Sequence, residues 1–269
     1  MRRPVIRIAM GLGLAAAAGC SAGPIEVAAF DEGILKKNLV ALWPMDDAVG
    51  SLTAKDRSIN KRDGAIAGGT FVPRQGGFGS ALHLELGNEV QVTPFPDALF
   101  DWTLVMWVLP EVILTPPAPG PMGVMTTRFV TLLSTEAVFS GGWEMNIALT
   151  SAPSDSPHYQ FGYWLGPGNS DYLTSSCACV VKSEWTHLAV VVERGMRMTF
   201  YENGKFQETK AMPLPIKPGS PTLFMGRWQS PGNRLFKGAL DDVAIYERAL
   251  SPREIQALVD APIPPPVLQ

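Results

Sequence analysis

Short apolar runs, each stopped by a turn-forming residue, limit most strongly how this chain can fold. Val40–Trp43 stops at Pro44, and Thr103–Val108 is followed by Pro110. Runs of this length that are rich in β-branched and aromatic residues are typical of strands. The same pattern recurs over Phe129–Leu133, Trp143–Leu149, Tyr159–Leu165, Leu188–Glu193, Met198–Glu202, Phe206–Thr209, Leu223–Gly226 and Val243–Tyr246. The chain is therefore predicted to be all-β, with turns supplied by its scattered Gly and Pro residues.

One helix is predicted after the last strand. Ser251 is a suitable N-cap, Pro252 suits the first helical position, and Glu254 completes a capping box. Pro262 and the prolines after it end the helix. We therefore expect one domain over 39–259, followed by a proline-rich tail over 260–269.

The first twenty residues predict export. Arg2 and Arg3 precede an apolar stretch, Val5–Ala18, which is too short and too rich in glycine for a membrane span. The small residues that lead to Cys20 resemble a bacterial lipobox. This resemblance implies a signal peptide over 1–19, a lipid on Cys20 and a tether over 20–38, and Ser21 then implies sorting to the outer membrane. The alternative is an ordinary secreted protein cleaved nearby.

Charge argues against one class of partner. The formal net charge is −3, whereas a nucleic-acid-binding chain needs a basic stripe that displaces counterions. No nucleic-acid partner is therefore predicted.

Two cysteines remain after Cys20, and their role stays open. The spacing of Cys177 and Cys179 is not that of a structural zinc site. In an oxidising compartment they pair with each other or with a partner chain, or they are incidental thiols at a strand end.

Seven segments, in order, resemble one known family. They are Leu39–Asp47, Asp56–Gly69, Phe78–Leu84, Trp102–Pro110, Trp185–Val191, Tyr201–Lys205 and Gly238–Leu250. Together they resemble the laminin-G-like, concanavalin A-like lectin/glucanase domains. The resemblance implies a jelly-roll β-sandwich of two antiparallel sheets with six or seven strands each. It also implies carbohydrate or protein binding and often a structural calcium ion. Trp43 and Trp107 are expected to bury large areas in its core.

Two of the predicted strands offer a candidate glycan-binding face. Alternate side chains of a strand point to opposite sides, so an apolar set faces the core and the other set faces outward. If Trp143–Leu149 and Tyr159–Leu165 are neighbours, the outward set includes an aromatic ring beside amide and carboxylate groups, which suits a sugar. This predicted site consists of Glu144, Asn146, Gln160 and Trp164. The alternative is a solvated outer face with one packed tryptophan.

A catalytic role is not predicted. Glycan hydrolases on this fold place carboxylates on one face of a strand with an E-x-D-x-x-E run, and this chain has no such run. Glu184, Glu193 and Glu202 are isolated at strand ends or turns. His83, His158 and His187 match no catalytic motif, and His187 is expected to be packed or to cap a turn. The prediction is thus a membrane-anchored glycan-binding module. The alternatives are a protein-binding module that uses loops Pro116–Thr127 and Ser151–His158, and an atypical glycan hydrolase.

A calcium site is predicted where the chain ends meet. If the first and last strands are antiparallel neighbours, Asp46 and Asp47 lie near Asp241 and Asp242, and four carboxylates so close need a cation or basic side chains between them. Asp56, Asn60 and Asp63 are candidates for further ligands. The alternative is that these aspartates cap turns or pair with Lys55, Arg57 or Arg62.

Overall fold

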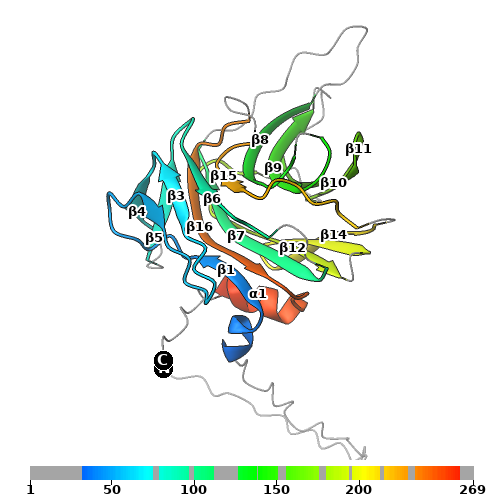
Figure 1. Ribbon diagram of the computed structural model, residues 1–269, viewed down its shortest axis with the longest axis horizontal. Helices are drawn as coiled ribbons and strands as arrows, with labels where there is room; N and C mark the ends of the chain where they lie inside the picture. The colour runs from blue at the N-terminus through cyan, green and yellow to red at the C-terminus, as the bar shows by residue number, and fades with distance from the viewer. Residues whose placement is uncertain are drawn as a thin grey trace, which may run out of the picture. The chain divides into compact units, whose positions relative to one another are not determined.

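Two antiparallel sheets make up the folded body in a computed structural model. The structure describes residues 32–74, 79–96, 100–111, 127–137, 139–150, 156–175, 180–193, 196–212, 215–229 and 234–260. Each sheet has eight strands, rather than the six or seven that the resemblance implies. The predicted all-β jelly-roll sandwich is confirmed (Figure 1).

Sheet A has the strand order β14-β13-β12-β7-β16-β5-β4, and β1 also pairs with β16. Its strands are β1 (Leu39–Trp43), β4 (Thr70–Pro73), β5 (Ser80–Leu84), β7 (Trp102–Pro110), β12 (Thr186–Glu193), β13 (Arg197–Glu202), β14 (Lys205–Ala211) and β16 (Gly238–Tyr246). A short 3-10 helix, η1 (Glu32–Lys36), precedes β1.

Sheet B has the order β11-β10-β9-β8-β15-β6-β3-β2. Its strands are β2 (Thr53–Ala54), β3 (Gly64–Ala67), β6 (Glu89–Val92), β8 (Thr127–Ser134), β9 (Trp143–Thr150), β10 (His158–Gly166), β11 (Asn169–Thr174) and β15 (Leu223–Met225).

The core lies between the two sheets, as the alternation of apolar side chains predicts. Trp43 is fully buried there, and Trp102 packs against Trp143 with ring centroids 5.5 Å apart. Trp107 is different: it faces away from the core on sheet A, because its neighbours Met106 and Val108 take the inward positions. The expectation that Trp107 is a core residue is therefore wrong.

The first and last strands pair antiparallel, as predicted. Trp43 lies opposite Val243 and Leu39 lies opposite Tyr246. Helix α1 (Pro252–Asp260) follows and begins at the predicted capping box, in which the Ser251 N–H donates to the Glu254 carboxylate over 2.8 Å. In Figure 1, α1 lies beside β1 and β16. Within the described part of the chain, no helix is long and apolar enough to cross a membrane.

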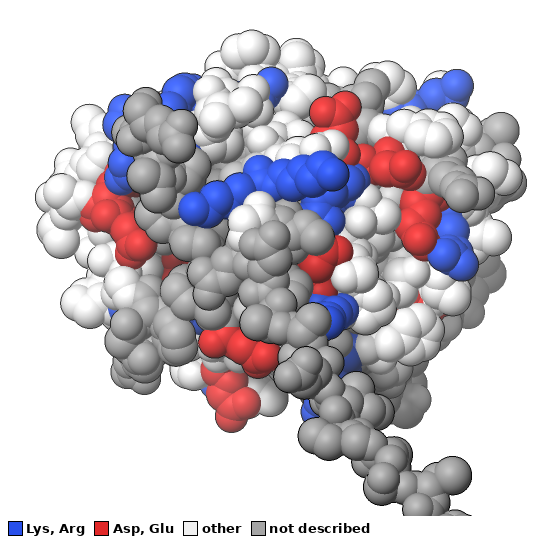
Figure 2. Space-filling view, turned by 90° about the horizontal axis from the view of Figure 1, so that it is seen from below, with Lys and Arg blue, Asp and Glu red and all other residues white. Residues whose placement is uncertain are grey.

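Charged side chains of both signs share the surface. In the view of Figure 2, basic side chains that cross the centre of the face have acidic side chains next to them. The face in this view therefore carries no unbroken basic stripe.

Candidate carbohydrate-binding face

The four predicted site residues share one face of sheet B. Strands β9 and β10 are antiparallel neighbours in which Gln160 lies opposite Asn146 and Gly162 lies opposite Glu144. The intervening residues of both strands are core residues, so Glu144, Asn146, Gln160 and Trp164 project from the outer side. The predicted grouping is correct. We refer to the outer side of β9, β10 and β11 as the β9–β11 face.

The expectation that this group is exposed is wrong. The exposed fraction is 3% for Glu144, 0% for Asn146 and 7% for both Gln160 and Trp164. Arg234, which enters from the segment before β16, donates to both Glu144 carboxylate oxygens over 2.7 and 3.0 Å. Nothing in the strand pattern could have indicated this partner, because Arg234 is 90 residues away.

Arg234 is held by aromatic rings as well as by its carboxylate partner. Its guanidinium carbon lies 4.5 Å from the centroid of the Phe129 ring and 4.6 Å from that of the Trp228 ring. A planar cation between two ring faces is favourably placed for cation–π attraction. Burial raises the pKa of Glu144, and the neighbouring Arg234 opposes that rise.

A second carboxylate lies close to this pair. Glu136 is buried and accepts hydrogen bonds from the backbone N–H of Phe139 and the indole N–H of Trp228. Burial raises its pKa to about 7, with a smaller rise from the negative charge of Glu144. Each of these two carboxylates is therefore bound by protein donors.

The exposed aromatic residues on or near this face are ones that the sequence analysis missed. Tyr172 lies in β11 opposite Gly162, so it shares the face with Glu144, and 53% of it is exposed. Phe139 is 49% exposed, and its ring packs against Trp164 with centroids 6.2 Å apart. A Gly-Pro-Gly turn after Leu165 was a usable signal for a hairpin and hence for β11.

The backbone of Tyr172 is fixed by sheet A. Lys210 on β14 donates to the Tyr172 carbonyl over 2.9 Å and to the Asp171 carboxylate over 2.7 Å. Glu208 accepts a hydrogen bond from the Thr174 N–H over 2.8 Å. Strand β11 is thus a braced edge strand that presents its tyrosine outward.

Gly162 leaves room between Tyr172 and Glu144. A Cβ atom added to Gly162 would lie 3.3 Å from Cγ of Glu144. The absence of a side chain at this position lets Glu144 lie over the strand and turn toward Arg234.

Of the four aspartates predicted to bind calcium, Asp46 and Asp47 follow β1, whereas Asp241 and Asp242 lie within β16, and protein groups contact all four. Asp46 accepts from the Ser80 N–H over 2.6 Å, and Asp47 accepts from the Lys55 N–H and from Arg57. The buried Arg74 guanidinium donates to Asp241 over 2.7 Å. Burial and the charge of Asp242 raise the pKa of Asp241, whereas Arg74 opposes this.

These residues do not fit a calcium ion as they are arranged. Arg74 supplies the positive charge between Asp241 and Asp242, and no group of three or more His, Cys, Asp or Glu is placed for a metal among the described residues. The further candidates organise a turn: Asp56 accepts from three backbone N–H groups, Asn60 donates to the Val40 carbonyl, and Asp63 pairs with Lys55. Calcium binding stays a prediction.

The histidines and the other glutamates named in the sequence analysis have structural contacts or simple surface positions. His187 is packed edge-on against Trp107, and burial, aided by the nearby Arg74 cation, lowers its pKa to about 3. His83 contacts Glu111 and Glu193 pairs with Arg197, whereas Glu202 is buried and Glu184 is exposed. Cys20, Cys177, Cys179, residues 116–126 of the first candidate loop and residues 151–155 of the second lie outside the described residues.

Comparisons with solved structures find the same fold in proteins of low sequence identity. One is domain 4 of AbnA, a GH43 extracellular arabinanase from Geobacillus stearothermophilus, solved in complex with arabinotriose. It is 19% identical with a TM-score of 0.58, and the match covers 82% of this chain and 98% of that one. The Ruminococcus gnavus IT-sialidase CBM40 bound to α2,3-sialyllactose is 16% identical with a TM-score of 0.51. The match covers 66% of this chain and 96% of that one.

A toxin domain has the same fold. The binding domain of botulinum neurotoxin DC, solved with rat synaptotagmin II, is 13% identical with a TM-score of 0.57, over 83% of this chain and 51% of that one. This chain thus spans about half of that binding domain.

A match to a family model assigns the chain to a family. No curated protein matches the chain in sequence. The family model described as the concanavalin A-like lectin/glucanases superfamily matches residues 87–256, which is more than half of the chain. The strand order and this match agree, and the chain belongs to the concanavalin A-like lectin/glucanase superfamily.

Proposed function

We propose that this protein is a non-catalytic carbohydrate-binding module that binds a glycan at the β9–β11 face. The observation that carries the proposal is the exposed Tyr172 ring on a braced strand, on the same face as the buried Glu144–Arg234 pair. An exposed ring presents an apolar face to the C–H groups of a sugar. The arabinotriose and sialyllactose complexes of similar structures support the choice of a glycan.

The roles of the face residues differ from those expected from sequence. Tyr172 and Phe139 provide the exposed contact area, whereas Trp164 supports Phe139 from below. Glu144 and Arg234 fix the floor of the face, because each satisfies the charge of the other. Changing Trp164 should therefore disturb packing, and Tyr172 is the better residue to test.

The carboxylate contacts favour binding over hydrolysis. A glycoside hydrolase needs a carboxylic acid that reaches the leaving oxygen and a second carboxylate on the other side of the sugar ring. In this protein both oxygens of Glu144 are bound by Arg234, and those of Glu136 are bound by Phe139 and Trp228. Turnover of a polysaccharide that is lost in Glu136→Gln would overturn the non-catalytic part of the proposal.

The test of the binding site uses one residue and two substitutions. In a glycan array that includes arabinotriose and α2,3-sialyllactose, Tyr172→Ala should weaken binding to the best glycan at least tenfold, or about 1.4 kcal/mol. Tyr172→Phe keeps the ring and should keep most of the affinity. A protein partner would instead give an array with no binder, as the synaptotagmin complex of a similar fold illustrates.

We also propose that the domain is exported and anchored by a lipid on Cys20, because Arg2 and Arg3, the apolar stretch Val5–Ala18 and the small residues before Cys20 form a lipoprotein signal pattern. The anchor would hold the domain at the outer membrane, where glycans of the cell surface are within reach.

A further inference from the structure

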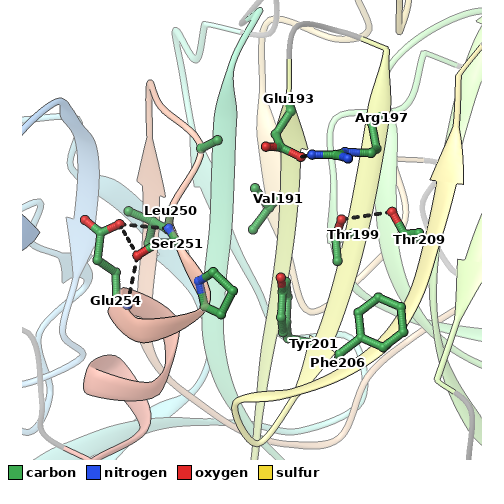
Figure 3. A pocket seen from close by; sticks show the side chains of 12 residues that line it. Val191, Glu193, Arg197, Thr199, Tyr201, Phe206, Thr209, Leu250, Ser251 and Glu254 are labelled. Atoms are coloured by element: carbon green, nitrogen blue, oxygen red, sulfur yellow. Dashed lines mark hydrogen bonds and ion pairs between the residues drawn. The ribbon is translucent and has the colours of Figure 1, made fainter.

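A hollow of about 540 Å³ lies on the outer side of sheet A, away from the β9–β11 face. It is open on one side and lies between the start of α1 and strands β12, β13 and β14 (Figure 3). Its volume is within the range of about 300–1,000 Å³ that is usual for small-molecule sites. Val191 is among the residues that line it. We refer to this hollow as the α1 groove.

An aromatic pair forms one end of the α1 groove. Tyr201 and Phe206 lie edge to face, with ring centroids 6.4 Å apart. Phe206 is 59% exposed, whereas Tyr201 is largely covered. The pair presents an apolar surface that is held in place by the register of β13 and β14, in which the two residues are opposite each other.

Hydrogen-bonding groups line the rest of the same wall. The hydroxyls of Thr199 and Thr209 are 3.1 Å apart across the two strands, as Figure 3 shows. Glu193 accepts from Nε of Arg197 over 2.7 Å at the opposite end from the rings. The side chain of Arg197 is 60% exposed and that of Glu193 is 36% exposed, so both are accessible to a ligand in the groove.

The other wall is rigid and leaves no unbalanced charge. Leu250 donates its N–H to the Thr103 hydroxyl over 3.0 Å, and Ser251 and Glu254 form the capping box of α1. The Glu254 carboxylate also pairs with Arg248 over 2.6 Å. Both carboxylates that line the groove thus have an arginine partner, which argues for a ligand without net charge.

We propose that the α1 groove is a second binding site, for a neutral oligosaccharide of two or three rings. An exposed ring beside hydroxyl and paired charged groups matches a ligand that is apolar on one face and rich in hydroxyls at its edge. The proposal extends the proposed function to a second site, and it rests on residues that the first site does not use. Two sites on opposite outer faces of a sandwich would let one monomer bridge two glycan chains.

The experiment separates the two sites by working in a Tyr172→Ala background. Maltotriose, cellotriose and xylotriose are titrated into this protein by calorimetry. At least one should bind, and adding Phe206→Ala should weaken that binding at least tenfold, since it removes the exposed ring. Arg197→Gln should weaken it at least threefold. Phe100→Ala, which removes another exposed ring, is the matched control and should change nothing.

Two results would overturn the second site. One is that no trisaccharide of the three binds the Tyr172→Ala protein, and the other is that binding survives Phe206→Ala unchanged. Neither result bears on the proposed site at the β9–β11 face, because Tyr172-dependent binding is measured separately in the Phe206→Ala protein. Conversely, groove binding that persists without any Tyr172-dependent binding would refute only the first site.

Discussion

Replacing Arg234 by methionine tests the account of the β9–β11 face through protein stability. Methionine keeps much of the apolar volume between Phe129 and Trp228 but removes the cation that faces Glu144. The side chain of Glu144 is 4% exposed, so its carboxylate would be left buried without a counter-charge. Breaking a buried pair in this way costs about 3–5 kcal/mol, and we take about 3 because the Arg234 side chain is partly exposed.

The expected effect is large enough for a simple assay. For a domain of this size, each kcal/mol lowers Tm by about 2–4 °C, so Arg234→Met should lower Tm by about 6–12 °C. Thermal unfolding at pH 7, followed by circular dichroism, measures this. Adding Glu144→Gln to the variant removes the stranded charge and should restore most of the loss, which makes the double mutant more stable than the single one.

A drop of less than 2 °C for Arg234→Met would refute the reasoning, since the pair would then contribute no more than an exposed salt bridge. A double mutant that is less stable than Arg234→Met would refute it too.

Three further predictions concern other parts of the chain. The pKa of Glu136 is raised to about 7, so between about pH 4.5 and 7 the folded protein binds more protons than the unfolded chain. The free energy of unfolding should therefore fall as pH rises through this range, and Glu136→Gln should flatten that dependence in urea unfolding. Because Arg74 already supplies the counter-charge at Asp241 and Asp242, Tm should be the same with calcium as with a chelator, and a higher Tm with calcium and bound metal would instead support the calcium site expected from the sequence. Mass spectrometry of the mature protein should find a diacylglyceryl group on Cys20, and normal processing of Cys20→Ala into the membrane would contradict it.

Much of the fold was predictable from local patterns. The apolar runs that lie within β1, β7, β9, β10 and β16 are short and rich in β-branched and aromatic residues, so their type was clear. The capping box located the first residue of α1. Strands β2–β6 and β11 were missed. Strands β2–β6 are short, and β3 and β11 also carry Gly, Asn or Asp, which are typical of turns.

The candidate face was predictable only in part. Alternation within β9 and β10 correctly placed Glu144 and Gln160 on one side. Burial of that side depends on Arg234 and Trp228, which come from a distant segment and are invisible to any pattern within a strand. The exposed Tyr172 was missed because its strand was missed. Contacts with distant segments, rather than the residue pattern within a strand, therefore decide which polar residues on this sheet are available to a ligand.

If Tyr172 on the β9–β11 face contacts a glycan, affinity must depend on its aromatic ring. The wild-type protein, Tyr172→Phe and Tyr172→Ala are titrated with the best glycan from the array. We expect similar Kd values for the first two and a Kd at least tenfold higher for Tyr172→Ala, with Tm values that agree because the ring is half exposed. Equal Kd values for all three folded proteins would contradict it.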